Sequence, residues 1–240
     1  MRIDKYLSNA NFGSRSEIKK MIKQNMIELN GKIIKNGKEQ IDLTKDIVKV
    51  NGKKISLETK RYLMLNKPQG VISATKDSSQ PTVIDLISSK DKIKDLAPVG
   101  RLDKDTTGLL LLTNDGKLAH ELLAPKKHVI KTYHALVSGI VDDSLIERFK
   151  NGITLKDGTN FKPAKLKILS INKENNTSKV SISISEGKYH QIKRMFKANQ
   201  MTVLTLHRLS MGSLFLDNSL QPGAYRRLSS QEINILKNKK

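Results

Sequence analysis

The sequence contains no cysteine and no tryptophan, and aromatic residues make up 4% of its 240 positions. The absence of cysteine excludes disulfide bonds and thiolate metal sites, and it is compatible with a reducing cytoplasm. Long apolar runs are also lacking: the longest hold about four or five residues, whereas a membrane-spanning helix needs about 20. The first residues carry no apolar signal-peptide core. We therefore expect a cytoplasmic protein that has no membrane partner.

Acidic residues are scarce relative to basic ones, because 23 Asp and Glu stand against 44 Lys and Arg, a net charge of +21. Such an excess indicates a polyanionic partner, nucleic acid or an anionic membrane surface, and says little about the fold. The histidines show no metal-ligand spacing, and we interpret them as surface or structural residues: His120, His128, His134, His190 and His207.

The chain is predicted to divide near residue 60, into a small domain at 1–58, a linker at 59–61 and a larger domain at 62–240. Ser14 and Glu17 have the spacing of a capping box, and the helix that follows places Ile18 and Ile22 inward. Asn30-Gly31 predicts a type I′ hairpin. We expect two short helices and a small hairpin in the first domain, with a further strand at 46–50.

The larger domain is rich in strand patterns. Strands are expected at 62–66, 109–112, 130–137, 164–173, 178–185 and 202–216. Helices are expected at 117–123, 142–151, 189–199 and from about 229 to the end, with Asp115 capping the first of them. Many strands with a few helices between them predict an α+β fold, whose mixed, mainly antiparallel sheet is flanked by helices.

The segment 100–116 is the most informative stretch. Asp103 stands in a polar loop between Arg101 and Lys104, just before the apolar run 109–112. That run is short, is bounded by turn residues, and is typical of a strand buried on both faces. A carboxylate at the end of a rigid strand is well placed for chemistry, although an isolated aspartate in such a loop is better explained as a turn residue.

Residues 100–116 as a whole resemble the catalytic motif of the RsuA/RluB/RluE/RluF family of pseudouridine synthases. In that family a Gly-Arg-Leu-Asp loop precedes a leucine-rich strand and Thr-Asn-Asp-Gly, as in this sequence. The resemblance implies the pseudouridine synthase fold and identifies Asp103 as the catalytic aspartate. It also implies a reaction that requires no cofactor and no metal.

Three further segments resemble family motifs. Lys131-Thr132-Tyr133 implies that Tyr133 stacks on the target base, although a strand tyrosine is more often packed in the core. In the segment 186–196, Lys193 occupies the position that supplies the cation paired with the aspartate, and Arg194 remains an alternative. The segment 206–212 resembles the last motif and implies that Leu206 packs beneath the base, where ordinary strand core is an equal explanation.

Residues 1–58 resemble the S4 RNA-binding domain, whose αL motif is seen in the order Arg-Ile-Asp-x-x-Leu, Ser-Arg-Ser-Glu and Ile-x-x-Asn-Gly-Lys. A basic helix face on a small domain is about as often an ordinary solvated surface. The resemblance implies that RNA phosphates contact the basic residues Arg2, Lys5, Arg15, Lys19, Lys20 and Lys23. In the larger domain we expect phosphate contacts from Lys67, Arg101 and Arg194.

The expected function is conversion of uridine to pseudouridine in ribosomal RNA by a monomeric enzyme. Residues 190–196 most resemble the RsuA branch, which modifies uridine 516 of 16S rRNA, so the expected partner is 16S rRNA in an assembling subunit. A 23S rRNA synthase of the RluB/E/F type and a non-catalytic S4-domain assembly factor are the alternatives. A metal-dependent phosphodiesterase using Asp103, Asp105 and Asp115 is a third, but Asp115 lies across the predicted strand from the other two.

Overall fold

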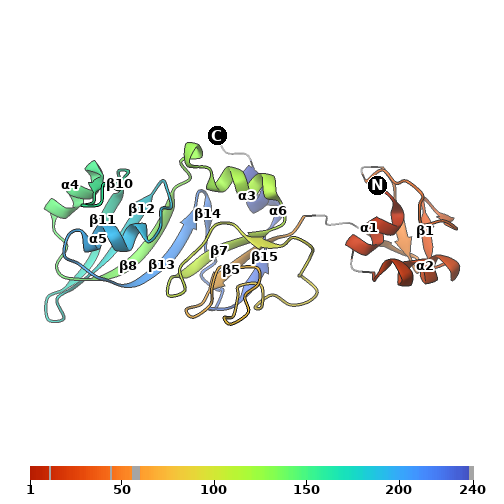
Figure 1. Ribbon diagram of the computed structural model, residues 1–240, viewed down its shortest axis with the longest axis horizontal. Helices are drawn as coiled ribbons and strands as arrows, with labels where there is room; N and C mark the ends of the chain where they lie inside the picture. Colours follow the sequence, from red (N-terminus) through yellow and green to blue (C-terminus); the bar gives the residue numbers. More distant parts are fainter. Residues whose placement is uncertain (11, 44, 56–59, 238–240) are drawn as a thin grey trace. The chain divides into compact units, whose positions relative to one another are not determined.

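A computed structural model describes the whole chain except residues 11, 44, 56–59 and 238–240 (Figure 1). The chain forms two compact units, Met1–Arg61 and Tyr62–Lys240. The linker predicted at 59–61 lies partly outside the described residues. Within the described part, no helix is both long and apolar enough to cross a bilayer.

The helices of the first unit are α1 (Ile3–Asn9) and α2 (Arg15–Lys23). The capping box predicted for α2 is confirmed: the Ser14 side chain accepts from the Glu17 amide, and the Glu17 carboxylate accepts from the Ser14 amide. Buried side chains of both helices meet in one hydrophobic cluster, to which Ile18 and Ile22 of α2 belong. The apolar faces therefore point inward and leave the basic residues of α2 exposed.

Four short strands complete this unit: β1 (Ile27–Leu29), β2 (Lys32–Ile33), β3 (Val48–Val50) and β4 (Lys53–Ile55). They form an antiparallel sheet in the order β2-β1-β3-β4. The predicted hairpin joins β1 and β2, and its two turn residues have positive φ, 51° at Asn30 and 81° at Gly31. A type I′ turn requires this conformation at both positions.

The second unit is built on a nine-stranded sheet whose main path is β11-β12-β8-β13-β7-β5-β15. These strands are β5 (Tyr62–Lys67), β7 (Thr107–Thr113), β8 (Lys131–Ser138), β11 (Lys165–Asn172), β12 (Thr177–Ile184), β13 (Val203–Met211) and β15 (Tyr225–Arg227). β6 (Ala97–Pro98) adds to β7 and β14 (Leu214–Phe215) adds to β13, while β9 (Ile153–Thr154) and β10 (Asn160–Phe161) form a separate pair. Only β13 and β7 pair in parallel among the described strands, so the predicted mixed, mainly antiparallel sheet is confirmed.

The central strands β5 and β7 are covered on both faces. Leu110 and Leu112 of β7 belong to one hydrophobic cluster, whereas Leu109 and Leu111 belong to another. Successive side chains of a strand point to opposite faces, so each cluster covers one face. Burial on both faces explains why four consecutive leucines form a strand here without polar alternation.

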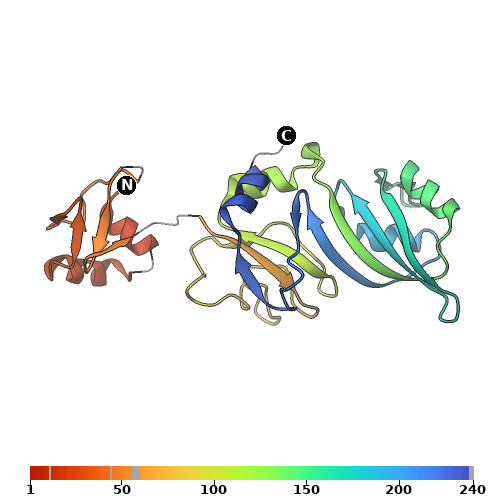
Figure 2. The same ribbon diagram turned by 180° about the vertical axis from the view of Figure 1, so that it is seen from behind.

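The helices of this unit are α3 (Gly116–Leu123), α4 (Asp143–Asn151), α5 (Gln191–Lys197) and α6 (Ser230–Lys237), with a short 3-10 helix at Pro125–Lys127. Leucines of α3 and α6 share one of the two clusters, and both views show these helices side by side (Figures 1 and 2). The phenylalanines of α4 and α5, Phe149 and Phe196, pack together in the other cluster with ring centroids 4.9 Å apart.

Two predicted boundaries were wrong. The single strand expected at 202–216 is two antiparallel strands, because the chain turns at Gly212, where φ is 58°. The helix expected from 189 begins at Gln191, because the preceding residue, His190, has a left-handed backbone with φ of 47°. The second difference affects the site, since His190 is thereby directed out of the helix.

Candidate active site

The loop that carries Asp103 joins β6 to β7, and Lys67 at the end of β5 is hydrogen-bonded to its backbone. The Lys67 ammonium donates to the carbonyl oxygens of Asp103 at 3.0 Å and Thr106 at 2.9 Å. Ser73 also contacts the loop backbone: its hydroxyl donates to the Leu102 carbonyl at 2.8 Å and accepts from the Leu102 amide at 3.0 Å. These contacts fix the backbone on both sides of Asp103.

The prediction that Lys67 meets an RNA phosphate was wrong. Its side chain is fully buried, with 0% exposure, and its ammonium is occupied by backbone carbonyls. Burial lowers the pKa of Lys67 to about 8, although the charges of Asp105 and Asp103 oppose this shift. Lys67 therefore supports the loop and is out of reach of a bound polyanion.

Gly108 lets β7 approach β13 closely at the start of the strand. It has φ of 99°, and a β-carbon there would lie 2.3 Å from the Arg208 carbonyl oxygen. The two residues are partners in the parallel pairing of β7 with β13. This approach brings the end of the Asp103 loop against β13, the strand that carries Leu206.

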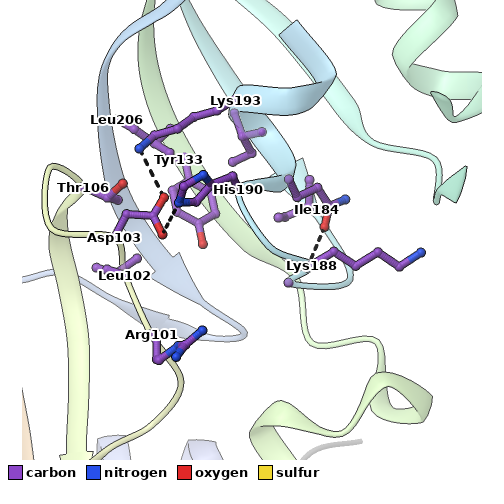
Figure 3. Close-up of a pocket in the computed structure, with 13 residues that line it drawn as sticks. Arg101, Leu102, Asp103, Thr106, Tyr133, Ile184, Lys188, His190, Lys193 and Leu206 are labelled. Carbon is purple, nitrogen blue, oxygen red and sulfur yellow. Dashed lines mark hydrogen bonds and ion pairs between the residues drawn. The ribbon is translucent and has the colours of Figure 1, made fainter. Parts of the chain in front are cut away.

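A pocket of about 440 Å³, counting its open mouth, lies beside Asp103 (Figure 3). Tyr133 of β8, Ile184 of β12 and Leu206 of β13 contribute its apolar and aromatic wall. Tyr133 and Leu206 are each almost buried, with 7% and 8% exposure. The exposed Arg101 also lines the pocket. The structure thus brings Asp103, Tyr133, Lys193 and Leu206 together around one pocket.

The two carboxylate oxygens of Asp103 face two different nitrogen groups of α5 and its N-cap. Lys193 places Nζ 3.2 Å from Oδ2, and His190 places Nε2 3.5 Å from Oδ1. Figure 3 shows both side chains converging on the carboxylate. The carboxylate is held from both sides but remains one-third exposed, with 33% of the side chain accessible. Such a group can act as a nucleophile or a proton acceptor toward a ligand in the pocket.

Sequence reasoning underestimated His190, which was interpreted as a surface or structural residue. Its position next to Gln191, in the segment that also supplies Lys193, was the available signal. The left-handed backbone that turns its ring toward Asp103 cannot be read from the residue types, since only a few per cent of non-glycine residues adopt it, even though histidine is among the types in which it is enriched.

Asp105 is the second residue whose place the sequence did not reveal, since it was considered for function only as a metal ligand of the phosphodiesterase alternative. The Lys193 ammonium lies 2.6 Å and 2.9 Å from the two Asp105 oxygens, closer than to Asp103. This hydrogen bond lowers the pKa of Asp105. Burial by itself would lower the pKa of the Lys193 ammonium, but the hydrogen bonds to Asp105 and Asp103 outweigh this effect, and the pKa is raised. One lysine therefore serves two carboxylates.

Arg194, the alternative partner of Asp103, is directed elsewhere. Its guanidinium donates to Asp157 at 2.6 Å and lies over the Phe161 ring, 5.4 Å from the centroid. Consecutive helical residues do not share a face, so Lys193 and Arg194 cannot both reach Asp103. The geometry favours Lys193 as the cation of the site.

Asp115 cannot join Asp103 and Asp105 in a metal site. It lies at the other end of the seven-residue strand β7, about 20 Å away at the usual strand rise. There its carboxylate accepts from the Tyr62 hydroxyl at 2.8 Å and caps α3. The metal-dependent phosphodiesterase alternative therefore lacks its third ligand.

The basic residues predicted to bind RNA in the first unit are only partly gathered. Arg2, Arg15, Lys19 and Lys23 line one groove together with Lys35 and Lys38, which the sequence reasoning did not single out. Lys5 and Lys20 are exposed outside that lining. Arg2 is also paired with Asp4. A groove with this many cations is suited to phosphate groups.

Comparisons with known proteins agree with this geometry. Residues 61–198 match the RNA pseudouridylate synthase family, and residues 1–48 match the S4 domain. The uncharacterised RNA pseudouridine synthase YtzG of Bacillus subtilis is 46% identical over 98% of both chains. Ribosomal small subunit pseudouridine synthase A of Haemophilus influenzae is 39% identical, over 98% of this chain and 99% of its own. A crystal structure of a pseudouridylate synthase superposes with a TM-score of 0.67, at 38% identity over 98% of this chain and 99% of that chain.

Proposed function

Because this chain belongs to the RNA pseudouridylate synthase family, we propose that it converts uridine to pseudouridine in ribosomal RNA, with 16S rRNA as the target. The observation that carries the proposal is the Asp103 carboxylate, held by Lys193 and His190 at the mouth of an apolar and aromatic pocket. The relatives named ribosomal small subunit pseudouridine synthase A support the choice of the small-subunit rRNA. The class of uridine 516 is proposed from the resemblance of residues 190–196 to the RsuA branch.

In this reaction the N1–C1′ bond of uridine breaks, the uracil rotates, and a C5–C1′ bond forms. C5 loses a proton and N1 gains one, so the product is an isomer and no redox change occurs. Asp103 supplies a carboxylate that either attacks the sugar or base or accepts a proton. Lys193 holds this carboxylate at the pocket, with its ammonium 3.2 Å from Oδ2.

The pocket holds the uracil while it is detached. We assign Tyr133 to stacking on the base and Leu206 to packing beneath it, because both side chains line the pocket beside Asp103. A uridine inside a helix has to be flipped out to enter, which costs a few kcal/mol. Binding of the flanking RNA offsets that cost, and Arg101 at the pocket is placed to contact a phosphate.

The S4 domain is assigned to holding the RNA. Its groove, lined by Arg15, Lys19 and Lys23 among others, is suited to phosphate contacts, which position a protein without reading sequence. We propose that a single copy of the chain acts on an assembling small subunit in the cytoplasm, because one chain carries both the groove and the pocket.

Carbodiimide mapping of pseudouridine across both large ribosomal RNAs tests this proposal. Cells that lack the protein should lose one pseudouridine of 16S rRNA, and wild-type protein should restore it whereas Asp103→Asn should not. Loss of a 23S rRNA pseudouridine instead would refute the assigned target. Unchanged modification of all ribosomal RNA would refute the proposed activity and favour a non-catalytic assembly factor.

A further inference from the structure

Tyr189 is an exposed aromatic residue next to the pocket, although it is not itself one of the residues that line it. It lies between β12 and α5, and 69% of its surface is accessible. Tyr6, Tyr62 and Tyr133 are buried. The neighbours of Tyr189 in the chain, Lys188 and His190, both line the pocket beside Asp103. An aromatic ring left in solvent at this position is therefore adjacent to the reacting centre.

The orientation of the Tyr189 ring is fixed by stacking. It lies on the His190 ring, with the centroids 3.8 Å apart and the planes inclined by 19°. The same His190 ring places its Nε2 3.5 Å from Asp103 Oδ1. One face of Tyr189 is therefore covered by histidine, and the large exposed fraction belongs to the opposite face and the edges of the ring.

We propose that this opposite face of Tyr189 is a stacking platform for the unpaired base next to the target nucleotide. The inference rests on the proposed function, since it requires an RNA substrate. When a uridine is flipped into the pocket, its neighbours lose a stacking partner, and an aromatic ring next to the pocket can replace it. Because every base has a π-face, the platform accepts any of the four bases.

The surroundings suit the sugar-phosphate chain of such a nucleotide. Lys188 and the exposed Arg101 line the same pocket. The Lys188 ammonium donates to the Asn160 carbonyl and lies 3.7 Å from a Glu186 oxygen, and 45% of its side chain remains accessible to a further anion. Cations beside an aromatic platform are the usual composition of a surface that binds single-stranded nucleic acid.

A steady-state comparison of Tyr189→Ala, Tyr189→Phe and Phe215→Ala tests the platform with a 16S rRNA substrate. Phe215 is a matched control, because it is an equally exposed aromatic residue, at 67%, on β14 outside the pocket. Tyr189→Ala should raise KM about 5- to 150-fold with little change in kcat, as expected for the loss of one base stack. Tyr189→Phe keeps the ring and should stay close to wild type, as should Phe215→Ala.

A second measurement identifies the ligand of the platform as a base. Substrates with an abasic sugar on the 5′ or the 3′ side of the target should show a raised KM with wild-type enzyme at one of these two positions. With Tyr189→Ala the same abasic sugar should cause no further increase, because the partner of the base is already missing. Equal KM values for Tyr189→Ala and wild type, or fully additive effects of the abasic sugar at both positions, would overturn the inference. Complete inactivity of the wild type on every RNA would instead refute the proposed function.

Discussion

Removing Lys193 should slow the chemical step far more than removing His190. Both groups face the Asp103 carboxylate, but Lys193 lies 3.2 Å from one oxygen and carries a full charge, while His190 lies 3.5 Å from the other. A hydrogen bond to a charged group contributes about 1.5–3 kcal/mol. The His190 contact, at 3.5 Å, is at the limit of hydrogen-bond length and should contribute less, about 0.5–1.5 kcal/mol. The carboxylate is partly exposed, so the larger penalties of fully buried pairs do not apply.

These free energies convert to rates that can be measured. Lys193→Gln should lower the single-turnover rate of pseudouridine formation about 10- to 150-fold, and His190→Ala about 2- to 10-fold. Lys193→Arg should retain most of the rate, because its guanidinium can contact both oxygens of Asp103 and keeps the charge. The double variant should lose less than the product of the two single losses, since both groups hold one carboxylate.

The assay is single-turnover conversion of a radiolabelled 16S rRNA fragment under saturating enzyme, with RNA affinity measured in parallel. A Lys193→Gln variant with a normal rate would refute the assignment of this lysine as the cation that holds Asp103. A larger loss for His190→Ala than for Lys193→Gln would refute the ranking, and would transfer the principal role to the histidine.

Three other predictions concern stability and RNA binding. Gly108→Ala should lower the free energy of unfolding by about 2 kcal/mol or more, because its β-carbon would clash with the Arg208 carbonyl; Gly116→Ala, where a β-carbon meets nothing within 4 Å, is the control in thermal denaturation. Since the pKa of Lys67 falls from 10.5 to about 8 on folding, the unfolded chain binds more protons between these values, and the free energy of unfolding should rise with pH there. Lys67→Met should lack that rise in urea titrations, and an equal slope would contradict the reasoning. Replacing three of the groove cations, Arg15, Lys19 and Lys23, by alanine should reduce the slope of log affinity against log salt concentration by roughly 0.7–0.9 per lost phosphate contact. An unchanged slope would mean that the groove does not touch the RNA.

Much of the fold could be predicted because its signals are local. The capping box of α2, the Asn30-Gly31 hairpin and the apolar run of β7 each lie within a few consecutive residues. Local signals also pointed to the candidate residues on a loop, a helix and two strands, because each lies in a segment that resembles a family motif. The turn at Gly212 was missed because the residues around it continue an apolar pattern that is compatible with one long strand.

The hydrogen bonds and ion pairs of the site could not be predicted, because they join segments that are distant in the sequence. Lys67 is 36 positions from Asp103, yet its ammonium bonds the backbone there, and no pattern in the sequence distinguishes this buried lysine from a surface one. Asp105 and Lys193 are 88 positions apart and meet only when α5 packs beside the loop. The role of His190 likewise depends on a left-handed backbone at the start of α5.

We propose that Asp103 is the carboxylate that performs the reaction. The most direct measurement compares Asp103→Asn with Asp105→Asn, two loop aspartates that contact the same lysine. We expect Asp103→Asn to form no detectable pseudouridine while binding 16S rRNA as tightly as wild type. Asp105→Asn should keep activity within about fivefold, because Lys193 can still hold Asp103 after one neutral hydrogen bond replaces a charged one. Measurable turnover by Asp103→Asn, or inactivity confined to Asp105→Asn, would contradict the assignment of Asp103 as the catalytic residue.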